Sequence, residues 1–317
     1  MRLERRAVID VGTNSTKMLV ADVAGHEVRP VWEGSKQTRL GQGLYETHRL
    51  QPEPLARTTQ AVAAFVAQAQ EHQATSIRVI ATSAARDATN SQELVDLIKH
   101  ATGLTLEIIS GEQEADWAFQ GVTTNLALAQ EPLLLMEVGG GSLQLILGQG
   151  EHKHFLQSYQ VGTVRLLQQI PHSDPPQAEE LEACRQWLRE FLRREVRPRL
   201  EPAMDQELRR QNSQSSIRLV GTGGTATILA RMEAELDSYD RDRLEAARLS
   251  PERLDWHVNH LWSLPLNRRQ QIVGLPPNRA DVILTGAVIY AAMMREFNFP
   301  ELRISTRGLR FAAVMQR

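Results

Sequence analysis

Residues 133–148, LLLMEVGGGSLQLILG, decide the fold of this chain. Residues 133–138 form a short apolar run that is typical of a buried strand, and leucines alternate at 143, 145 and 147 as in a second strand. Three glycines and a serine lie between the two runs. Glycines let backbone amides approach a ligand with no Cβ in the way, and such amides can form an anion-binding nest.

Glu137 is the one ionisable residue of the first apolar run, and it lies where the run meets the glycines. A carboxylate beside a phosphate-sized turn suits a phosphate held through a divalent cation, because the cation binds both groups. A tight hairpin with an edge glutamate explains the same residues. This stretch alone therefore leaves both interpretations open.

A second copy of the stretch lies near the N-terminus. The motif DVGTNS at residues 10–15 follows the apolar residues 7–9 and precedes another apolar run. At one constant offset, Asp10 matches Glu137, Gly12 matches Gly139 and Ser15 matches Ser142. Two similar hairpins predict two similar halves that face each other across a cleft.

The composition agrees with two α/β domains. The chain has 317 residues, enough for about two domains of ordinary size, and only 5% of them are aromatic. The net charge of −2 gives no support to a nucleic-acid or membrane surface, which normally needs a basic excess. We therefore expect no nucleic-acid or membrane partner.

The cysteine count and the apolar runs bear on the compartment. Cys184 is the one cysteine, so no disulfide can form within the chain, and its neighbours at helical spacing place it in the core. The N-terminus has arginines without a following apolar segment, and no run of about eighteen apolar residues occurs. We expect a soluble, cytoplasmic protein.

Three further motifs carry candidate site residues. In ATSAARD, residues 81–87, Arg86 follows a strand end and suits either a phosphate clamp or a surface arginine capping the next helix. In SGEQEAD, residues 110–116, the acids open a helix, where they complement its dipole or where one acts as a general base. The third motif, GTGGT at residues 221–225, forms a glycine turn before a helix, as in anion or nucleotide sites, but lacks the Rossmann and P-loop spacings.

Asp174 lies in a proline-rich turn before a long amphipathic segment. Aspartate is favoured at helix N-caps, because its side chain accepts a hydrogen bond from a free backbone amide. We expect Asp174 to cap the helix that contains Cys184.

Together these motifs resemble the exopolyphosphatase / guanosine pentaphosphate phosphohydrolase (Ppx/GppA phosphatase) family. DVGTNS and EVGGGS resemble its two phosphate loops, ATSAARDATN its strand-exit arginine motif and SGEQEA its catalytic-glutamate motif. GTGGTAT, RADVILTGA and STRGLR extend the resemblance over nearly the whole chain. The resemblance implies an α/β fold of two similar ribonuclease H-like (actin-like ATPase) domains flanking a central cleft. The expected domains are 1–124, to which the helix 307–317 returns, and 125–306.

The resemblance also implies roles for individual residues. Glu114 would activate the attacking water as the catalytic residue. The terminal phosphates would be held by Arg86 and the two loops, through Thr13, Asn14, Ser15, Gly139, Gly140, Gly141 and Ser142. The third turn would bind nucleotide or phosphate through Gly221, Gly223, Gly224 and Thr225. Mg²⁺ or another divalent cation would be held by Asp10, Glu137 and Gln144.

This chain departs from the family pattern at the second loop. Glu137 replaces the usual aspartate, and Leu143 and Gln144 replace the usual threonine and glutamate. Because Gln144 is neutral, we expect a lower affinity for the cation. The sequence also ends without the C-terminal domains that longer members use to grip polyphosphate.

The expected activity is metal-dependent hydrolysis of the terminal phosphate of inorganic polyphosphate, guanosine pentaphosphate, or both, which would connect the chain to the stringent response. One alternative is a catalytically weakened regulator that binds guanosine tetra- or pentaphosphate, as Gln144 suggests. Another is a kinase or ATPase of the same fold, as GTGGT suggests. A homodimer is a possible assembly for this family, although no residue pattern in the chain indicates one.

Overall fold

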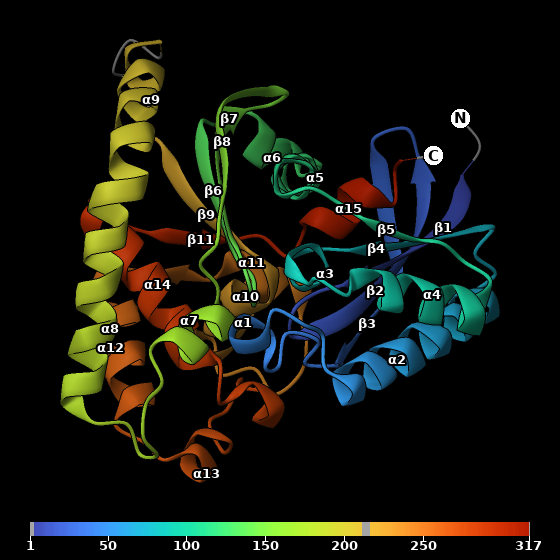
Figure 1. Cartoon of the computed structure of the whole chain (residues 1–317). Coiled ribbons are helices and arrows are strands. Elements are labelled where there is room, and N and C mark those ends of the chain that lie inside the picture. Colours follow the sequence, from blue (N-terminus) through green and yellow to red (C-terminus); the bar gives the residue numbers. More distant parts are fainter. Residues whose placement is uncertain (1–2, 211–215, 317) are drawn as a thin grey trace. The chain divides into compact units, whose positions relative to one another are not determined.

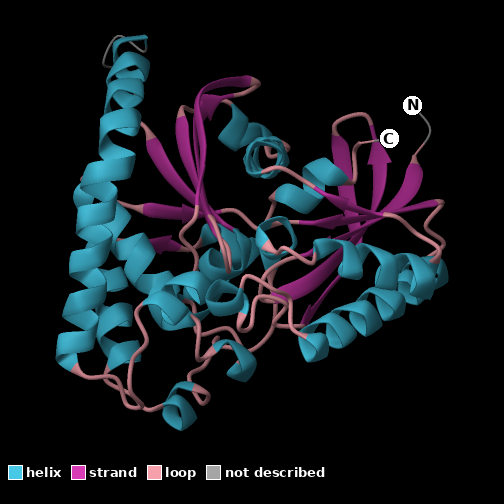
Figure 2. Ribbon diagram, in the orientation of Figure 1, coloured by secondary structure: helices cyan, strands magenta, loops and turns pink. Residues whose placement is uncertain are grey.

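The computed structural model describes residues 3–210 and 216–316. It divides into two compact units (Figure 1). Unit 1 comprises Met1–Asn125, Gly139–Ser142 and Arg307–Arg317, and unit 2 comprises Leu126–Val138 and Leu143–Thr306. Each unit contains one mixed β-sheet with helices packed against it (Figure 2).

Unit 1 is built on a sheet in the order β3-β2-β1-β4-β5. The first three strands pair antiparallel, and β1, β4 and β5 pair parallel. Its strands are β1 (Glu4–Val11), β2 (Ser15–Ala24), β3 (Glu27–Gln37), β4 (Ser76–Ala81) and β5 (Leu106–Ile108). Its helices are α1 (Leu44–Thr47), α2 (Pro52–Glu71), α3 (Ser83–Asp87), α4 (Ser91–Thr102), α5 (Gly111–Thr123) and α15 (Leu309–Ala313).

Unit 2 repeats this topology. Its sheet has the order β10-β11-β9-β6-β7-β8, in which β8, β7 and β6 pair antiparallel and β6, β9 and β11 pair parallel. Its strands are β6 (Leu133–Val138), β7 (Leu143–Gln149), β8 (His152–Tyr159), β9 (Arg218–Thr222), β10 (Arg248–Leu249) and β11 (Leu302–Ile304). Read from β8 to β11, the order matches unit 1 from β3 to β5.

The helices of unit 2 include long elements on the sheet and short connectors. They are α6 (Leu126–Ala129), α7 (Thr163–Gln169), α8 (Ala178–Phe191), a π-helical segment (Leu192–Val196), α9 (Arg197–Arg210), α10 (Gly223–Glu233), α11 (Arg241–Ala246), α12 (Pro251–Trp262), α13 (Leu266–Arg269), a 3₁₀ turn (Pro277–Arg279) and α14 (Ile283–Glu296). In the part of the chain that the structure describes, no helix has the length and apolar character needed to traverse a lipid bilayer.

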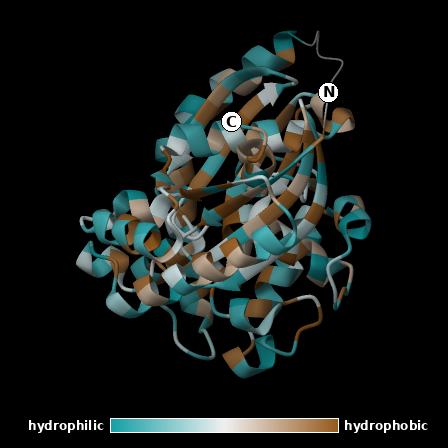
Figure 3. Ribbon diagram, turned by 90° about the vertical axis from the view of Figure 1, so that its right-hand side faces the viewer, coloured by the Kyte–Doolittle hydropathy of each residue, from teal (hydrophilic) through white to brown (hydrophobic). Residues whose placement is uncertain are grey.

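The sheet of unit 1 is buried on both faces because its central strands are apolar on both sides. Alternate residues of β1, such as Ile9 and Val11, pack with Phe65 of α2 in one core, whereas Val8 packs with Phe311 of α15 in another. In the hydropathy view, hydrophobic residues follow the strands and the helices mix hydrophobic with hydrophilic residues (Figure 3). This pattern is typical of parallel strands that are covered on both faces.

The expected N-cap at Asp174 is wrong. Helix α8 begins after Gln177, whose side chain accepts from the backbone, while the Glu180 carboxylate accepts from the Gln177 amide at 2.7 Å. Asp174 instead accepts a hydrogen bond from the backbone amide of Leu266 at 2.7 Å. The capping box formed by Gln177 and Glu180 therefore sets the start of α8, although aspartate is the more favoured residue type at an N-cap.

Candidate active site

Each of the two glycine turns is closed by an equivalent backbone hydrogen bond. The Gly12 amide donates to the Ser15 carbonyl at 3.0 Å, and the Gly139 amide donates to the Ser142 carbonyl at 2.9 Å. A Cβ added to Gly12 would lie 3.0 Å from the Ser15 carbonyl oxygen. The sequence match between the two stretches thus corresponds to a match in backbone geometry, at the carboxyl ends of β1 and β6.

The first turn is held by the segment that follows β3. The Thr13 carbonyl accepts from the Gly41 amide at 2.8 Å, and the Asn14 carbonyl accepts from the Arg39 amide at 3.0 Å. The side chains of Thr13, Asn14 and Ser15 are buried. Because these contacts fix the backbone before any ligand arrives, the turn is preorganised.

The second turn, Gly139–Ser142, belongs to unit 1 and contacts the first turn there. A Cβ added to Gly140 would lie 2.8 Å from the Thr13 Cβ. At Gly141, an added Cβ would lie 2.2 Å from the Tyr45 hydroxyl, 2.4 Å from the Ser83 hydroxyl and 2.9 Å from the Thr13 hydroxyl. Glycine is therefore needed at both positions for close packing.

The sequence did not predict that Tyr45 and Ser83 lie against the second glycine turn. Ser83 lies in the same strand-exit motif as Arg86, so its position was a usable signal. Tyr45 lies in α1, a single turn after a glycine-bearing loop. Nothing in the local sequence indicates that this loop returns to the second glycine turn.

Glu114 is the buried acid among the three that open α5. The residue is 8% exposed, whereas Glu112 is exposed and Asp116 is half-buried. Ser110 caps the helix by accepting from the Gln113 amide at 3.0 Å, and this cap sets the first turn that carries Glu114. The structure thus selects one acid where helix-dipole arguments alone left three.

Arg86 lies against Glu114. Both terminal nitrogens of Arg86 donate to Oε2 of Glu114 at 3.2 Å, and Nη1 also donates to the Ile109 carbonyl at 2.9 Å. The Ser142 hydroxyl donates to the other oxygen, Oε1, at 3.5 Å. The interpretation of Arg86 as a surface residue that caps the next helix is wrong, because its guanidinium is bound to Glu114 and its side chain is only 26% exposed.

Asp10 is the penultimate residue of β1 and lies beside the first turn. Its Oδ1 atom is buried and has no hydrogen-bond partner among the described residues. Burial raises the pKa of Asp10, and attraction to Lys17 and Arg310 opposes that rise. A buried carboxylate oxygen without a donor fits a site for a cation, because a cation supplies the missing interaction.

In unit 2, Glu137 lies between Gln144 and Thr222. It pairs in register with Gln144 on antiparallel β7 and with Thr222 on parallel β9. Gln144 is 1% exposed, so its neutral side chain occupies a buried position directly opposite the carboxylate. Glu137 and Gln144 are thus direct cross-strand neighbours in unit 2.

The third glycine turn of unit 2 packs against Glu137. Gly223 has φ +83°, and a Cβ added there would lie 2.8 Å from Oε1 of Glu137. The Thr225 hydroxyl donates to the Val138 carbonyl at 2.9 Å, and Gly224 is half-buried. Gly221 lies within β9 against core side chains. This turn therefore shapes the surroundings of Glu137 within unit 2.

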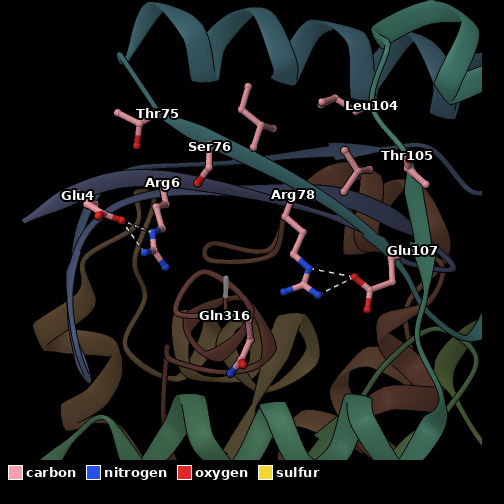
Figure 4. Close-up of a pocket in the computed structure, with 11 residues that line it drawn as sticks. Glu4, Arg6, Thr75, Ser76, Arg78, Leu104, Thr105, Glu107 and Gln316 are labelled. Carbon is pink, nitrogen blue, oxygen red and sulfur yellow. Dashed lines mark hydrogen bonds and ion pairs between the residues drawn. The ribbon is translucent and has the colours of Figure 1, made fainter.

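A cavity of about 920 Å³ in unit 1 lies away from the glycine turns (Figure 4). It is lined by the amino ends of β1 and β4, whereas the turns follow the carboxyl ends of these strands. Arg6 and Arg78 line it, but Arg6 pairs with Glu4 at 2.5 Å and Arg78 with Glu107 at 2.7 Å. Because both guanidiniums are neutralised, this cavity is a poorer phosphate site than the turns.

No group of three or more His, Cys, Asp or Glu side chains within residues 3–210 and 216–316 is arranged to hold a metal ion. A magnesium ion does not need such a cluster. It is usually bound by one or two carboxylates, waters and the phosphates of the substrate. Asp10 in unit 1 and Glu137 in unit 2 each lie near the end of a strand before a glycine turn, so each unit offers one carboxylate of the kind that binds magnesium.

Comparison with known proteins identifies relatives over almost the whole chain. The model of the Ppx/GppA phosphatase family matches residues 19–315. Exopolyphosphatase 2 of Mycobacterium tuberculosis is 34% identical over 307 residues, which cover 93% of this chain and 92% of the relative.

Solved structures agree in fold. A Ppx/GppA family member from Aquifex aeolicus is 26% identical, with a TM-score of 0.78 over 99% of this chain and 97% of the other. An exopolyphosphatase from Cytophaga hutchinsonii is 23% identical and shares the fold, with a TM-score of 0.84 over 98% of this chain and 96% of the other. The expected α/β fold class is thereby confirmed.

Proposed function

The chain belongs to the Ppx/GppA phosphatase family, and on that premise we propose that it hydrolyses the terminal phosphoanhydride bond of inorganic polyphosphate. The relative named exopolyphosphatase 2 supports this substrate. Guanosine pentaphosphate, which also ends in a phosphate joined through an anhydride, is the second substrate to test.

The observation that carries the proposal is the arrangement of Glu114. Arg86 binds Oε2, and the Ser142 hydroxyl of a glycine turn approaches Oε1. A general base must lie within hydrogen-bond reach of the water it activates, and its side chain must be held in place. Arg86 holds the carboxylate, and Oε1 lies on the side of the phosphate turn.

In the proposed reaction, a water oxygen attacks the terminal phosphorus, and Glu114 accepts the proton that the water loses. The bridging P–O bond breaks, and its electron pair leaves with the shortened polyphosphate. Orthophosphate and a chain shorter by one unit are the products. This chemistry relies mainly on positioning and electrostatic stabilisation, because the transferred phosphoryl group is loosely bonded in the transition state.

The glycine turns would bind the terminal phosphate through their backbone amides, with Thr13, Asn14 and Ser15 from one turn and Ser142 from the other. The guanidinium of Arg86 would bind a phosphate oxygen while keeping its contact with Glu114, since an arginine has five N–H donors.

Asp10 and Glu137 are the carboxylates that would hold a divalent cation, with the amide oxygen of Gln144 as a neutral neighbour. When bound, such a cation offsets the negative charge that develops as the anhydride breaks. The buried Oδ1 atom of Asp10 supports this assignment.

The test is phosphate release by purified protein with Mg²⁺, with polyphosphate, guanosine pentaphosphate and ATP offered in parallel. Release from polyphosphate that is lost in Glu114→Gln supports the hydrolase. Release from guanosine pentaphosphate alone would assign the other substrate, and ATP turnover with a phosphoryl acceptor would favour a kinase. No release at any Mg²⁺ concentration would contradict the proposal.

Gln144 motivates one competing function, a regulator that binds guanosine tetra- or pentaphosphate without cleaving it. The side chain is buried opposite Glu137, where a carboxylate would strengthen cation binding. Calorimetric binding of guanosine tetraphosphate without phosphate release would favour this alternative.

A further inference from the structure

The strand that carries Glu137 ends between two hydroxyl groups supplied by helices of unit 2. The Met136 carbonyl, just before Glu137, accepts a hydrogen bond from the Tyr290 hydroxyl of α14 at 3.0 Å. The Val138 carbonyl, just after it, accepts from the Thr225 hydroxyl of α10 at 2.9 Å. The main chain of Glu137 is therefore held on both sides by side chains from outside its own strand.

Tyr290 also reaches the neighbouring strand. The pairing of β6 with β9 ends at the register pair of Glu137 and Thr222. The Tyr290 hydroxyl lies 3.4 Å from the Thr222 carbonyl, so one side chain bonds to both strands at the point where their ladder stops. Strand ends fray more readily than strand centres, so a side-chain bridge at this point limits the movement of both strands.

The sequence of β9 makes room for this tyrosine. Gly221 pairs in register with Met136, and a Cβ added to it would lie 3.1 Å from the Cε1 atom of Tyr290, which is fully buried. A larger residue at position 221 would press on the ring. The first glycine of the GTGGT motif therefore suits the packing of Tyr290.

Both strand ends that Tyr290 holds lead directly to the carboxylate of Glu137. A Cβ added to Gly223, the residue after Thr222, would lie 2.8 Å from Oε1 of Glu137. Burial raises the pKa of Tyr290 well above its ordinary value, and the negative charge of Glu137 adds to that rise, so the two side chains interact electrostatically. A shift of either strand would therefore move the carboxylate relative to the turn beside it.

We propose that Tyr290 is a positioning residue whose hydroxyl fixes the ends of β6 and β9 and thereby places the Glu137 carboxylate for a divalent cation. This inference rests on the proposed function, in which Glu137 is a cation ligand. It extends that function to a residue outside every motif of the sequence analysis. Groups that orient a metal ligand without touching the metal typically change its affinity or activity by about 10- to 100-fold when they are removed.

The test is Tyr290→Phe, which removes only the hydroxyl oxygen, with Tyr159→Phe as the matched control. Tyr159 is also a buried tyrosine of unit 2, but its hydroxyl has no hydrogen-bond partner among the described residues. Below the melting temperature of each variant, we expect Tyr290→Phe to need about tenfold more Mg²⁺ for half-maximal phosphate release, with kcat recovered at saturating Mg²⁺. Tyr159→Phe should keep the wild-type requirement. A wild-type Mg²⁺ dependence in Tyr290→Phe overturns the inference.

The double variant with Glu137→Gln shows whether Tyr290 acts through the carboxylate. Glu137→Gln alone should raise the Mg²⁺ requirement, because it removes the charge of the ligand. Adding Tyr290→Phe should raise the requirement no further, since the group to be positioned is already lost. Independent effects would multiply in the double variant, and that result would leave Tyr290 a purely structural role and overturn the inference.

A measurement without turnover separates this inference from the proposed function. Mg²⁺ should raise the melting temperature of the wild-type protein relative to EDTA, because a ligand that binds only the folded state stabilises it. The rise should be smaller in Tyr290→Phe and unchanged in Tyr159→Phe, even if the protein releases no phosphate, and equal rises in all three overturn the inference. A wild-type protein that neither releases phosphate nor is stabilised by Mg²⁺ contradicts both proposals.

Discussion

Arg86 and Glu114 form the central contact of the candidate site, with both terminal nitrogens of the arginine 3.2 Å from a single carboxylate oxygen. The contact leaves the second oxygen of Glu114 beside Ser142. Glu114 is thus fixed by one residue and directed toward another, as the proposed role of a base requires.

Arg86→Ala should lower the free energy of unfolding by about 1–3 kcal/mol, because the buried carboxylate of Glu114 loses its guanidinium. It should also reduce kcat, since Glu114 is no longer held. Arg49→Ala is the control: its pair with Glu93 is 57% and 52% exposed, so about 1 kcal/mol or less is expected. Urea unfolding measures both variants, and equal losses would count against the structural role of the Arg86 contact.

Glu114→Gln should lower kcat by about 10²- to 10⁴-fold, because an amide cannot accept the proton of the attacking water. Substrate binding should persist, since the phosphate turns are unchanged. Steady-state phosphate release and calorimetric binding measure the two effects separately. If the variant kept wild-type turnover, Glu114 could not be the base.

Gln144→Glu should make stability depend on divalent cations. The new carboxylate would face Glu137 in register at a buried position, so the variant should melt at a lower temperature than wild type in EDTA. Added Mg²⁺ should recover the loss and reach half-maximal activity at a lower concentration than in wild type. The same Mg²⁺ dependence in both proteins would argue against a cation at Glu137.

Gly141→Ala should reduce activity, because its methyl group would lie 2.2 Å from the Tyr45 hydroxyl and 2.4 Å from the Ser83 hydroxyl, so the second glycine turn would have to shift. Gly103→Ala provides the opposite case, since Gly103 has φ +72° and an added Cβ there meets nothing within 4 Å. That variant should lose about 1 kcal/mol of stability and keep full activity. Paired melting curves and phosphate release assays check both, and full activity in Gly141→Ala would exclude a ligand at this position.

Cys184 should resist alkylation in the folded protein. Burial raises the pKa of its thiol to about 12, and the nearby charge of Arg185 opposes this rise only in part. The unfolded thiol ionises near its usual pKa of 9.0, so stability should be unaffected below that pH and fall as the pH rises from 9.0 toward the folded value. Iodoacetamide labelling at pH 8.5, with and without denaturant, tests the burial. Rapid labelling of the native protein would disprove it.

Local sequence was sufficient to predict those secondary-structure elements that a short stretch of residues defines. The hairpins around DVGTNS and EVGGGS, the strand before Arg86 and the helix that opens with Glu114 were all predicted, because apolar runs and glycines define them locally. The roles assigned to these residues remain predictions. Only the family resemblance distinguished Glu114 from Glu112 and Asp116, because the local pattern of acids at a helix start does not show which of them is buried by tertiary packing.

Tyr45 shows why the rest could not be predicted. Its proximity to Gly141 results from a loop closure across nearly a hundred residues, and no periodicity or spacing records such a contact. The prediction that Asp174 is an N-cap failed for a different reason: a capping box that begins three residues downstream, at Gln177, sets the start of the helix. Contacts between residues far apart in the sequence can be identified only from the three-dimensional structure.

Helix α15 has a consequence for biosynthesis. Leu309 and Phe311 fill one face of the sheet of unit 1 together with Val8 and Trp117, yet they follow the whole of unit 2 in the sequence. At ordinary translation rates a ribosome needs about 10 to 40 seconds to make the intervening residues. During that interval the nascent unit exposes an apolar sheet face, so this protein is expected to depend on chaperone protection until its last helix emerges.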